Sequence, residues 1–135
     1  MRIPAIALAI AAGALPAAGL ATSPADFERQ FAIAASQGGA PFTGFSAERG
    51  QRFFTATHGN DWSCASCHTR NPSAPGKHAT TGKDIAPLAP AANAKRFTDA
   101  AKVEKWFARN CKDVLARPCT PMEKGDVMAY LLSSR

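Results

Sequence analysis

The sequence predicts an all-α protein with about four to five helices and one long loop. Apolar residues recur at helical spacing in four segments, and no segment alternates between apolar and polar residues as a half-buried strand does. Between the second and third segments, residues 69–96 contain four prolines and two glycines and show little periodicity. A loop of this length is uncommon in a compact domain unless it has a function or is supported by a cofactor.

Residues 1–21 have the composition of a cleaved signal peptide. Arg2 supplies a positive charge, residues 3–15 are apolar, and small residues before Thr22 allow cleavage there. A membrane anchor is the alternative, but this segment is shorter than the ~20 apolar residues of a spanning helix and contains prolines. We therefore expect residues 22–135 to form one mature domain that is soluble in the periplasm.

Two helices are predicted in the N-terminal half. Ser23 followed by a proline is typical of a helix start, and Phe27 and Phe31 lie on one face of the helix that follows. Ser46 is the predicted N-cap of a second helix over residues 47–56. This second helix leads toward a motif with two cysteines.

A third helix is predicted to begin after Thr98 or Asp99. Its spacing places four residues on one face, which must point inward: Val103, Trp106, Phe107 and Asn110. The apolar members of that face predict a core contact.

The last helix is predicted to begin at a capping box formed by Thr120 and Glu123 and to continue to about Ser133. Tyr130 on this helix and Gly50 on the second helix are a large and a small residue. We therefore expect the two helices to cross closely at this pair.

Residues 64–68 have the sequence Cys-Ala-Ser-Cys-His, the C-x-x-C-H attachment motif of a c-type haem. Cys64 and Cys67 are expected to bind one porphyrin covalently, and His68 to bind the iron as proximal ligand. A zinc site and a thioredoxin-like dithiol are the alternatives. Zinc lacks further ligands at a suitable spacing, and a dithiol would follow a β-strand rather than a polar turn. One covalently bound haem c is the predicted cofactor.

The chain carries a formal net charge of +6. This surplus favours an acidic redox partner or a membrane surface. No run of consecutive basic residues and no interleaved aromatic residues indicate nucleic-acid binding.

Several side chains are candidates to surround the haem. Trp106 and Phe107 are predicted to pack in the core or against the haem. Lys83 and Arg96 are candidates to bind its propionates, although solvated surface charges are the alternative. The backbone carbonyl of Pro87 or Pro90 is expected to accept a hydrogen bond from the ring N–H of His68.

The second axial ligand decides what such a haem does. Met122 or Met128 would give an ordinary His/Met electron carrier, and His58 or His78 would give a bis-histidine haem. Both methionines lie in or beside a helical stripe typical of core residues, and isolated histidines are usually surface residues. Asn110 is the remaining candidate, and a helix C-cap is its alternative interpretation. The residues alone leave these possibilities open.

Several motifs resemble those of the SHP-type cytochromes c, a family named after the sphaeroides haem protein. The similarity extends from AERG at residues 47–50 to the last helix. The other segments that carry it are TGKDIAPLAP at 81–90, RFTD at 96–99, KVEKW at 102–106, RNC at 109–111 and CT at 119–120.

The resemblance implies a class I cytochrome c fold in which Asn110 is the distal ligand of the iron. It implies that reduction releases this ligand, so that O2, NO or CO can bind, and that Cys111 and Cys119 form a disulfide beside it. A di-haem cytochrome c and a membrane cytochrome b are the implied redox partners. The protein would then be an electron carrier and gas binder without catalytic residues. A haem enzyme that reduces oxygen or nitrogen oxides is a further alternative.

Overall fold

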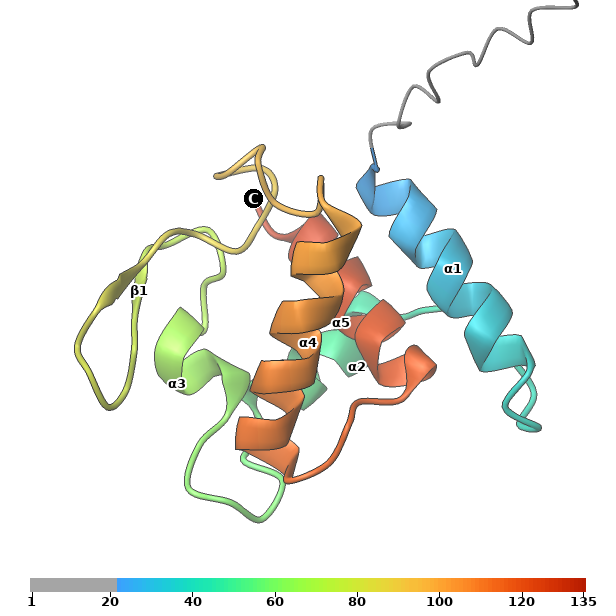
Figure 1. The fold of residues 1–135 in the computed structure, drawn as a ribbon, viewed down its shortest axis with the longest axis horizontal. Coiled ribbons are helices and arrows are strands. Elements are labelled where there is room, and N and C mark those ends of the chain that lie inside the picture. Colours follow the sequence, from blue (N-terminus) through green and yellow to red (C-terminus); the bar gives the residue numbers. More distant parts are fainter. Residues whose placement is uncertain (1–21) are drawn as a thin grey trace, which may run out of the picture.

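The computed structural model describes residues 22–135, which form five helices and one short β-hairpin (Figure 1). The predicted signal peptide at residues 1–21 lies outside the described residues. The predicted all-α fold is confirmed. In chain order the elements are α1 (Pro24–Ser36), α2 (Ala47–Thr55), α3 (Cys64–His68), β1 (Gly76–Lys77), β2 (Asp84–Ile85), α4 (Ala100–Leu115) and α5 (Pro121–Ser133).

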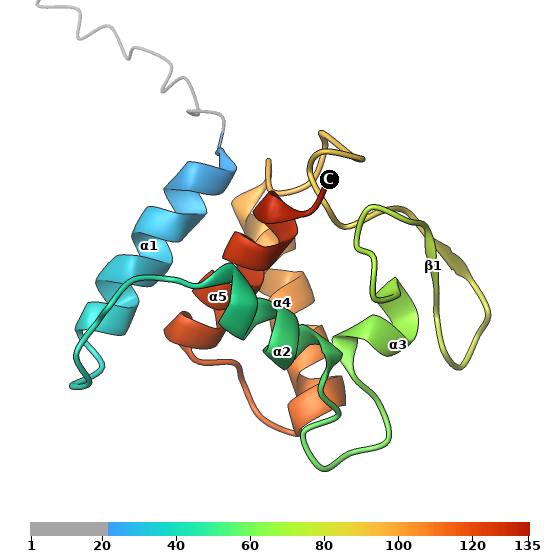
Figure 2. The ribbon, with the colours of Figure 1, turned by 180° about the vertical axis from the view of Figure 1, so that it is seen from behind.

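The last helix, α5, packs against both α1 and α2. α1 lies at one end of the molecule and the β-hairpin at the other (Figures 1 and 2). α3 is next to the hairpin, and Cys64 on α3 and Phe107 on α4 pack against the same buried cluster. The cysteine motif and the helix that carries Asn110 are therefore neighbours.

Each long helix begins at its predicted N-cap. The side chains of the capping residues accept a hydrogen bond from the backbone N–H three residues later, which satisfies one of the unpaired donors at a helix start. These residues are Ser23, Ser46, Asp99 and Thr120.

The helix that contains Asn110 is longer than a C-cap at that position would allow. α4 continues to Leu115 and ends at Ala116, which has a left-handed backbone with φ 56°. Asn110 lies inside the helix, so its interpretation as a C-cap is wrong.

The long loop contains a β-hairpin that the sequence analysis does not predict. Gly76 pairs with Ile85, and Lys77 pairs with Asp84. Each strand has two residues, which is too short for an alternating pattern to be visible. A Cβ on Gly76 would lie 2.1 Å from the carbonyl oxygen of Cys67. Glycine therefore allows the hairpin to approach α3 more closely than any other residue would.

Helices α2 and α5 cross at Gly50. A Cβ on Gly50 would lie 1.9 Å from the carbonyl oxygen of Asp126 and 3.0 Å from the Cβ of Tyr130. The predicted crossing of Gly50 and Tyr130 is confirmed. Because glycine has no side chain, the backbones of the two helices are in direct contact.

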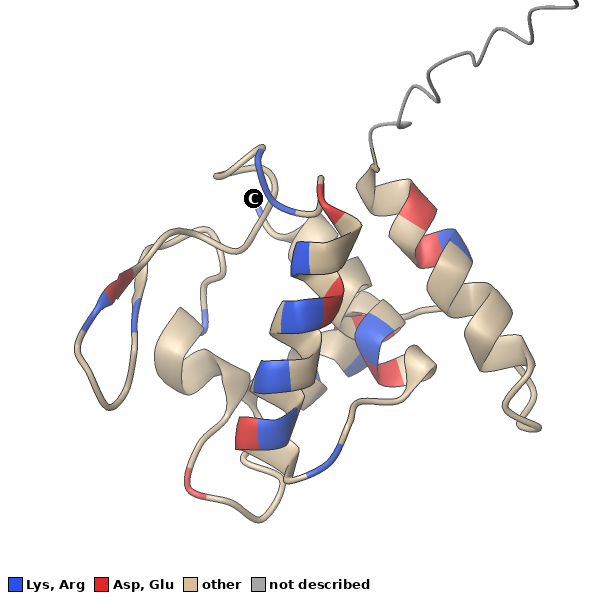
Figure 3. Cartoon of the chain, viewed as in Figure 1, with Lys and Arg blue, Asp and Glu red and all other residues tan. Residues whose placement is uncertain are grey.

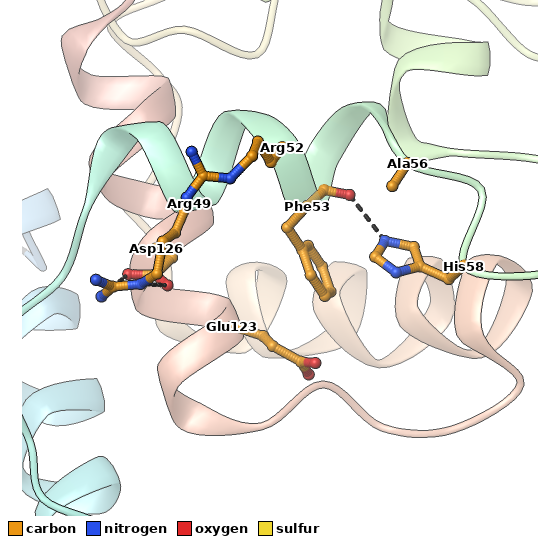
Figure 4. Close-up of a pocket in the computed structure, with 7 residues that line it drawn as sticks. All are labelled: Arg49, Arg52, Phe53, Ala56, His58, Glu123 and Asp126. Carbon is orange, nitrogen blue, oxygen red and sulfur yellow. Dashed lines mark hydrogen bonds and ion pairs between the residues drawn. The ribbon is translucent and has the colours of Figure 1, made fainter.

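A buried carboxylate fixes the same pair of helices. The Asp126 side chain is 7% exposed and accepts hydrogen bonds from the Arg49 guanidinium, at 2.8 Å from both Nε and Nη2. It also accepts a bond from the backbone N–H of Ser46 at 2.7 Å. The hydrogen bonds to Asp126 raise the pKa of Arg49. These contacts join α5 to the first turn of α2 (Figure 4).

Replacing Asp126 by alanine is expected to lower the free energy of unfolding by about 2–3 kcal/mol, because Ser46 and Arg49 lose a shared acceptor. Arg49 is 41% exposed, which limits the cost of leaving its charge unpaired. Urea unfolding of the haem-containing protein measures the change. Glu48→Ala is the control, because the exposed pair of Glu48 with Arg52 should contribute about 0.5 kcal/mol. Equal losses in the two variants would contradict the prediction.

Two clusters of buried residues form the core. Phe97 and Phe107 are half-buried and pack against both clusters. The Lys124 ammonium lies 2.7 Å from the Glu104 carboxylate and over the rings of Phe31, at 5.4 Å, and Phe107, at 5.7 Å. These contacts join α1, α4 and α5. The buried members are Phe27, Phe31, Val103 and Met128 in one cluster and Phe54, Val127, Tyr130 and Leu131 in the other.

Candidate haem-binding site

The cysteine motif forms its own short helix, α3. Ser63 is the N-cap and forms a capping box with Ser66. Cys64 and Cys67 are three residues apart on this helix, so their side chains lie on the same side of it. Both thiols are free and half-buried. His68 is the last residue of the helix.

The surroundings of the motif fit a covalently bound haem. Burial raises the pKa of the Cys64 thiol to about 11. Burial, and next the positive charge of Arg96, lower the pKa of His68 to about 4, so its imidazole is neutral at pH 7. Neutral imidazole is the form that binds a metal. The ring of Phe54 lies 6.4 Å from that of His68 and provides an apolar neighbour. Two free thiols and one neutral imidazole within five consecutive residues are the groups that attach haem c and bind its iron on one side.

A zinc site gains no support from the structure. Among residues 22–135, no three His, Cys, Asp or Glu side chains are grouped closely enough to hold a metal ion. Both thiols of the motif therefore lack the partners that a structural zinc site requires.

The β-hairpin covers the motif from one side. The backbone N–H of Ala79 donates a hydrogen bond to the sulfur of Cys67 at 3.3 Å. Gly76 lies against the carbonyl oxygen of the same cysteine. No local signal marks the role of Gly76, because a glycine that follows a proline in a loop is the ordinary composition of a turn.

Arg96 holds the rest of the long loop in place. Its Nε donates to the carbonyl of Pro87 at 2.8 Å, and its Nη2 donates to the carbonyl of Ala86 at 2.6 Å. The Pro87 carbonyl also accepts a bond from Asn93 at 3.3 Å. Arg96 therefore fixes the backbone of the loop at Ala86 and Pro87. Within the described residues, the Pro87 carbonyl accepts bonds from Arg96 and Asn93 and none from His68.

Asn110 lies on α4, after the half-buried Phe107. Asn110 is half-buried and makes no hydrogen bond through its side chain to any other residue between 22 and 135. Phe107, one turn before it, packs edge-on against Phe31 with ring centroids 5.8 Å apart. The amide of Asn110 is thus free of competing bonds within the part of the chain that is described.

Trp106 differs from its predicted place in the core. It is 48% exposed, and the Arg109 guanidinium lies over its ring at 5.2 Å. The core interpretation is wrong because the buried stripe of α4 consists of Val103, Cys111 and Val114, and Trp106 lies at its edge. Packing of Trp106 against the haem stays a prediction.

The methionines proposed as alternative ligands have other contacts. Met128 is completely buried in the cluster that joins α1, α4 and α5. The Met122 sulfur accepts a hydrogen bond from Arg49 Nη2 at 3.8 Å. Both sulfurs therefore have contacts of their own within residues 22–135.

The histidines proposed as alternative ligands are both exposed. His58 Nε2 donates to the carbonyl of Phe53 at 2.8 Å. His78 Nδ1 accepts bonds from the backbone N–H groups of Thr80 and Thr81, each at 3.3 Å. Both rings are therefore held by local backbone contacts.

The predicted disulfide is confirmed. Cys111 and Cys119 are bonded, with their Cα atoms 5.5 Å apart. The bond ties α4 to the segment before α5, directly after Asn110 in the chain. Asn60 adds a second tie, because its side chain donates to the carbonyl of Val114 at 2.7 Å.

A surface cleft of about 430 Å³ lies elsewhere, beside α2 and α5 (Figure 4). It contains no residue of the cysteine motif and no residue of α4. Its polar side chains are largely paired, since Arg49 binds Asp126 and Arg52 binds Glu48. The lining residues are Arg49, Arg52, Phe53, Ala56, His58, Glu123 and Asp126.

A helical domain with a C-x-x-C-H helix beside an apolar core defines a monohaem class I c-type cytochrome. The chain belongs to the family of SHP-type cytochromes c, and residues 40–131 match the family described as a domain of unknown function (DUF1924). Within residues 22–135, no helix has the length and apolar character needed to cross a membrane.

Two curated relatives support this assignment. The cytochrome c-type protein SHP of Cereibacter sphaeroides is 46% identical over 114 residues, which are 82% of this chain and 83% of that protein. Cytochrome c'' of Methylophilus methylotrophus is 51% identical over 82 residues, which are 61% of this chain and 57% of that protein. The chain thus spans little more than half of the length of cytochrome c'' in that match.

Solved structures of the same two proteins have this fold. Oxidised SHP, described as an oxygen-binding cytochrome c, matches with a TM-score of 0.72 and 46% identity over 82% of this chain and 96% of that chain. The solution structure of Methylophilus methylotrophus cytochrome c'', described as giving insights into haem-ligand detachment, matches with a TM-score of 0.71 and 39% identity over 82% of this chain and 93% of that chain. The cofactor is therefore haem c, and Cys64 and Cys67 fit its attachment.

Proposed function

We propose that this protein is a periplasmic electron-transfer cytochrome whose distal ligand, Asn110, leaves on reduction and so allows O2, NO or CO to bind. The observation that carries this proposal is the place of Asn110, inside α4 and without a side-chain hydrogen bond to another described residue. The description of SHP as oxygen-binding and of cytochrome c'' in terms of haem-ligand detachment supports the proposal.

The residues of the chain have distinct roles in this function. A bound haem supplies an iron that carries one electron by changing between the ferric and ferrous states. His68 provides a neutral ring nitrogen from α3, with Phe54 as an apolar neighbour. The amide oxygen of Asn110 is a weak, hard donor that ferric iron accepts better than ferrous iron. Reduction therefore favours release of Asn110, and the freed amide N–H can donate a hydrogen bond to a gas molecule.

Spectra of the purified protein in both oxidation states test this function. We expect a high-spin ferrous absorption spectrum and prompt binding of carbon monoxide, because Asn110 has then left the iron. Electron paramagnetic resonance of the ferric form shows whether a distal ligand is bound to the iron before reduction. A low-spin ferrous spectrum that carbon monoxide does not change would overturn the proposal and favour a methionine ligand.

Removing the disulfide is expected to speed the binding of nitric oxide. In the double variant Cys111→Ser, Cys119→Ser, residue 111 is no longer bonded to the segment before α5. The side-chain amide of Asn110 can then move further from the iron. The same variant should lose about 2–3 kcal/mol of unfolding free energy on the chain-entropy account. Stopped-flow mixing with nitric oxide measures the rate.

The control for the disulfide variant is Asp126→Ala. It should lose a similar unfolding free energy but leaves the α4 tether intact, so its nitric oxide kinetics should match those of the wild type. Unchanged kinetics in the disulfide variant would count against a role of the bridge in ligand release.

A further inference from the structure

Helix α4 presents a basic face to the surface. Four basic side chains follow one another at spacings of three or four residues, so they share one side of the helix. All four are exposed and together extend over about 15 Å of helix. Figure 3 shows blue bands that repeat along α4. The residues of this basic face are Lys102, Lys105, Arg109 and Lys112.

Most of this charge has no partner within the described chain. Lys102 lies 3.3 Å from the Asp99 carboxylate at the helix start. Among residues 22–135, no carboxylate oxygen lies within 4.0 Å of the charged nitrogens of the other three members. A run of unpaired like charges costs free energy by self-repulsion unless a partner of opposite charge binds it.

The acidic residues of α4 do not neutralise the basic face. The Glu104 carboxylate is bound by Lys124 on α5 at 2.7 Å. Asp113 is exposed and lines a separate cleft with residues 59–62. Both carboxylates therefore face neighbouring elements.

The basic face borders the side of α4 that carries Asn110. Arg109 directly precedes Asn110, and its guanidinium covers the ring of Trp106, which lies one turn earlier on the helix. Exposed arginine and tryptophan side chains are the residues that most often dominate protein interfaces. Phe107 on the same helix packs against the cluster that Cys64 also contacts, so a molecule bound to α4 would be close to the haem-attachment motif.

We propose that the basic face of α4 is the docking surface for an acidic redox protein that gives an electron to the haem. In the transfer one electron leaves the donor's reduced cofactor and converts ferric to ferrous iron, and no atoms are exchanged. Opposite charge on the partner raises the rate of encounter in a way that salt screens. The proposal requires the haem c of the family and does not depend on Asn110 as the distal ligand.

The test uses fully reduced flavodoxin, an acidic electron-transfer protein, as the probe. Flavodoxin hydroquinone gives one electron to the ferric cytochrome and becomes the semiquinone. We expect Lys105→Glu, Lys112→Glu to lower the second-order rate constant about tenfold at low salt, with the difference vanishing at high salt. The control is the double variant Arg29→Glu, Arg52→Glu. It changes the net charge by the same amount, but its two substitutions are on α1 and α2. We expect it to slow the reaction less than about twofold.

Two further measurements separate the outcomes. Titration with oxidised flavodoxin should shift the amide resonances of α4 in the wild type and not in the Lys105→Glu, Lys112→Glu variant. Equal rates in the two double variants would overturn the proposal, because net charge alone would then govern the reaction. Loss of binding to phosphatidylglycerol vesicles in the α4 variant, with unchanged flavodoxin kinetics, would assign the face to a membrane surface instead.

Discussion

Gly50→Ala is expected to destabilise the protein by at least about 3 kcal/mol, the upper range for overpacking a core. The new methyl group would lie 1.9 Å from the carbonyl oxygen of Asp126, which belongs to the backbone and cannot rotate away. Helices α2 and α5 would have to separate, which would also strain the bonds between Asp126 and Arg49. Urea unfolding followed by far-UV circular dichroism and by haem absorbance measures the loss.

Gly38→Ala is the matched control for this change. A Cβ on Gly38 would lie 3.3 Å from the carbonyl oxygen of Ala35 at the exposed end of α1, so a small adjustment accommodates it. We expect its unfolding free energy to stay within about 0.5 kcal/mol of the wild type. A similar small effect in Gly50→Ala would mean that α2 can move from α5 at little cost, contrary to the backbone contact described above.

Asn110→Ala is expected to change the ferric protein much more than the ferrous protein. In the ferric state the variant lacks the amide that competes for the iron, so its affinity for added imidazole should rise about tenfold or more, equivalent to about 1.4 kcal/mol. Under the proposed function the wild-type amide leaves the iron on reduction, so the affinity for carbon monoxide should be nearly the same in both ferrous proteins. Absorption titrations measure both affinities.

Arg109→Gln is the control, because Arg109 adjoins Asn110 in the chain but its guanidinium lies over Trp106. Its imidazole and carbon monoxide affinities should equal those of the wild type. If Asn110→Ala leaves the ferric spectrum and the imidazole affinity unchanged, Asn110 is not the distal ligand. Oxygen should also dissociate faster from Asn110→Ala than from the wild type. Equal lifetimes of the two oxygen complexes would contradict a hydrogen bond from the freed amide to bound oxygen.

Sequence patterns predicted the helices because their signals are local. A capping side chain and apolar residues at helical spacing act within one or two turns, so Ser23 and Thr120 mark helix starts without knowledge of the fold. The cysteine motif is local too, since its three functional side chains occupy five consecutive residues. The disulfide was predicted through the resemblance to a known family.

Contacts between distant segments were harder to predict. The exposure of Trp106 depends on which part of α4 the other helices cover, and helical spacing alone does not define the edge of that stripe. The hairpin at Gly76 forms because the loop packs against α3, and two-residue strands leave no pattern. No local pattern marks Asp126, although its carboxylate binds Ser46 and Arg49 and its backbone carbonyl lies against Gly50 of α2.

The hairpin has a consequence for the order of events during biogenesis. The sulfur of Cys67 accepts a hydrogen bond from Ala79, and the glycine of β1 lies against the carbonyl of the same residue. Closing of the hairpin over α3 would narrow the access of an attachment enzyme to that sulfur, so we expect the haem to be attached faster in a chain whose hairpin is still open.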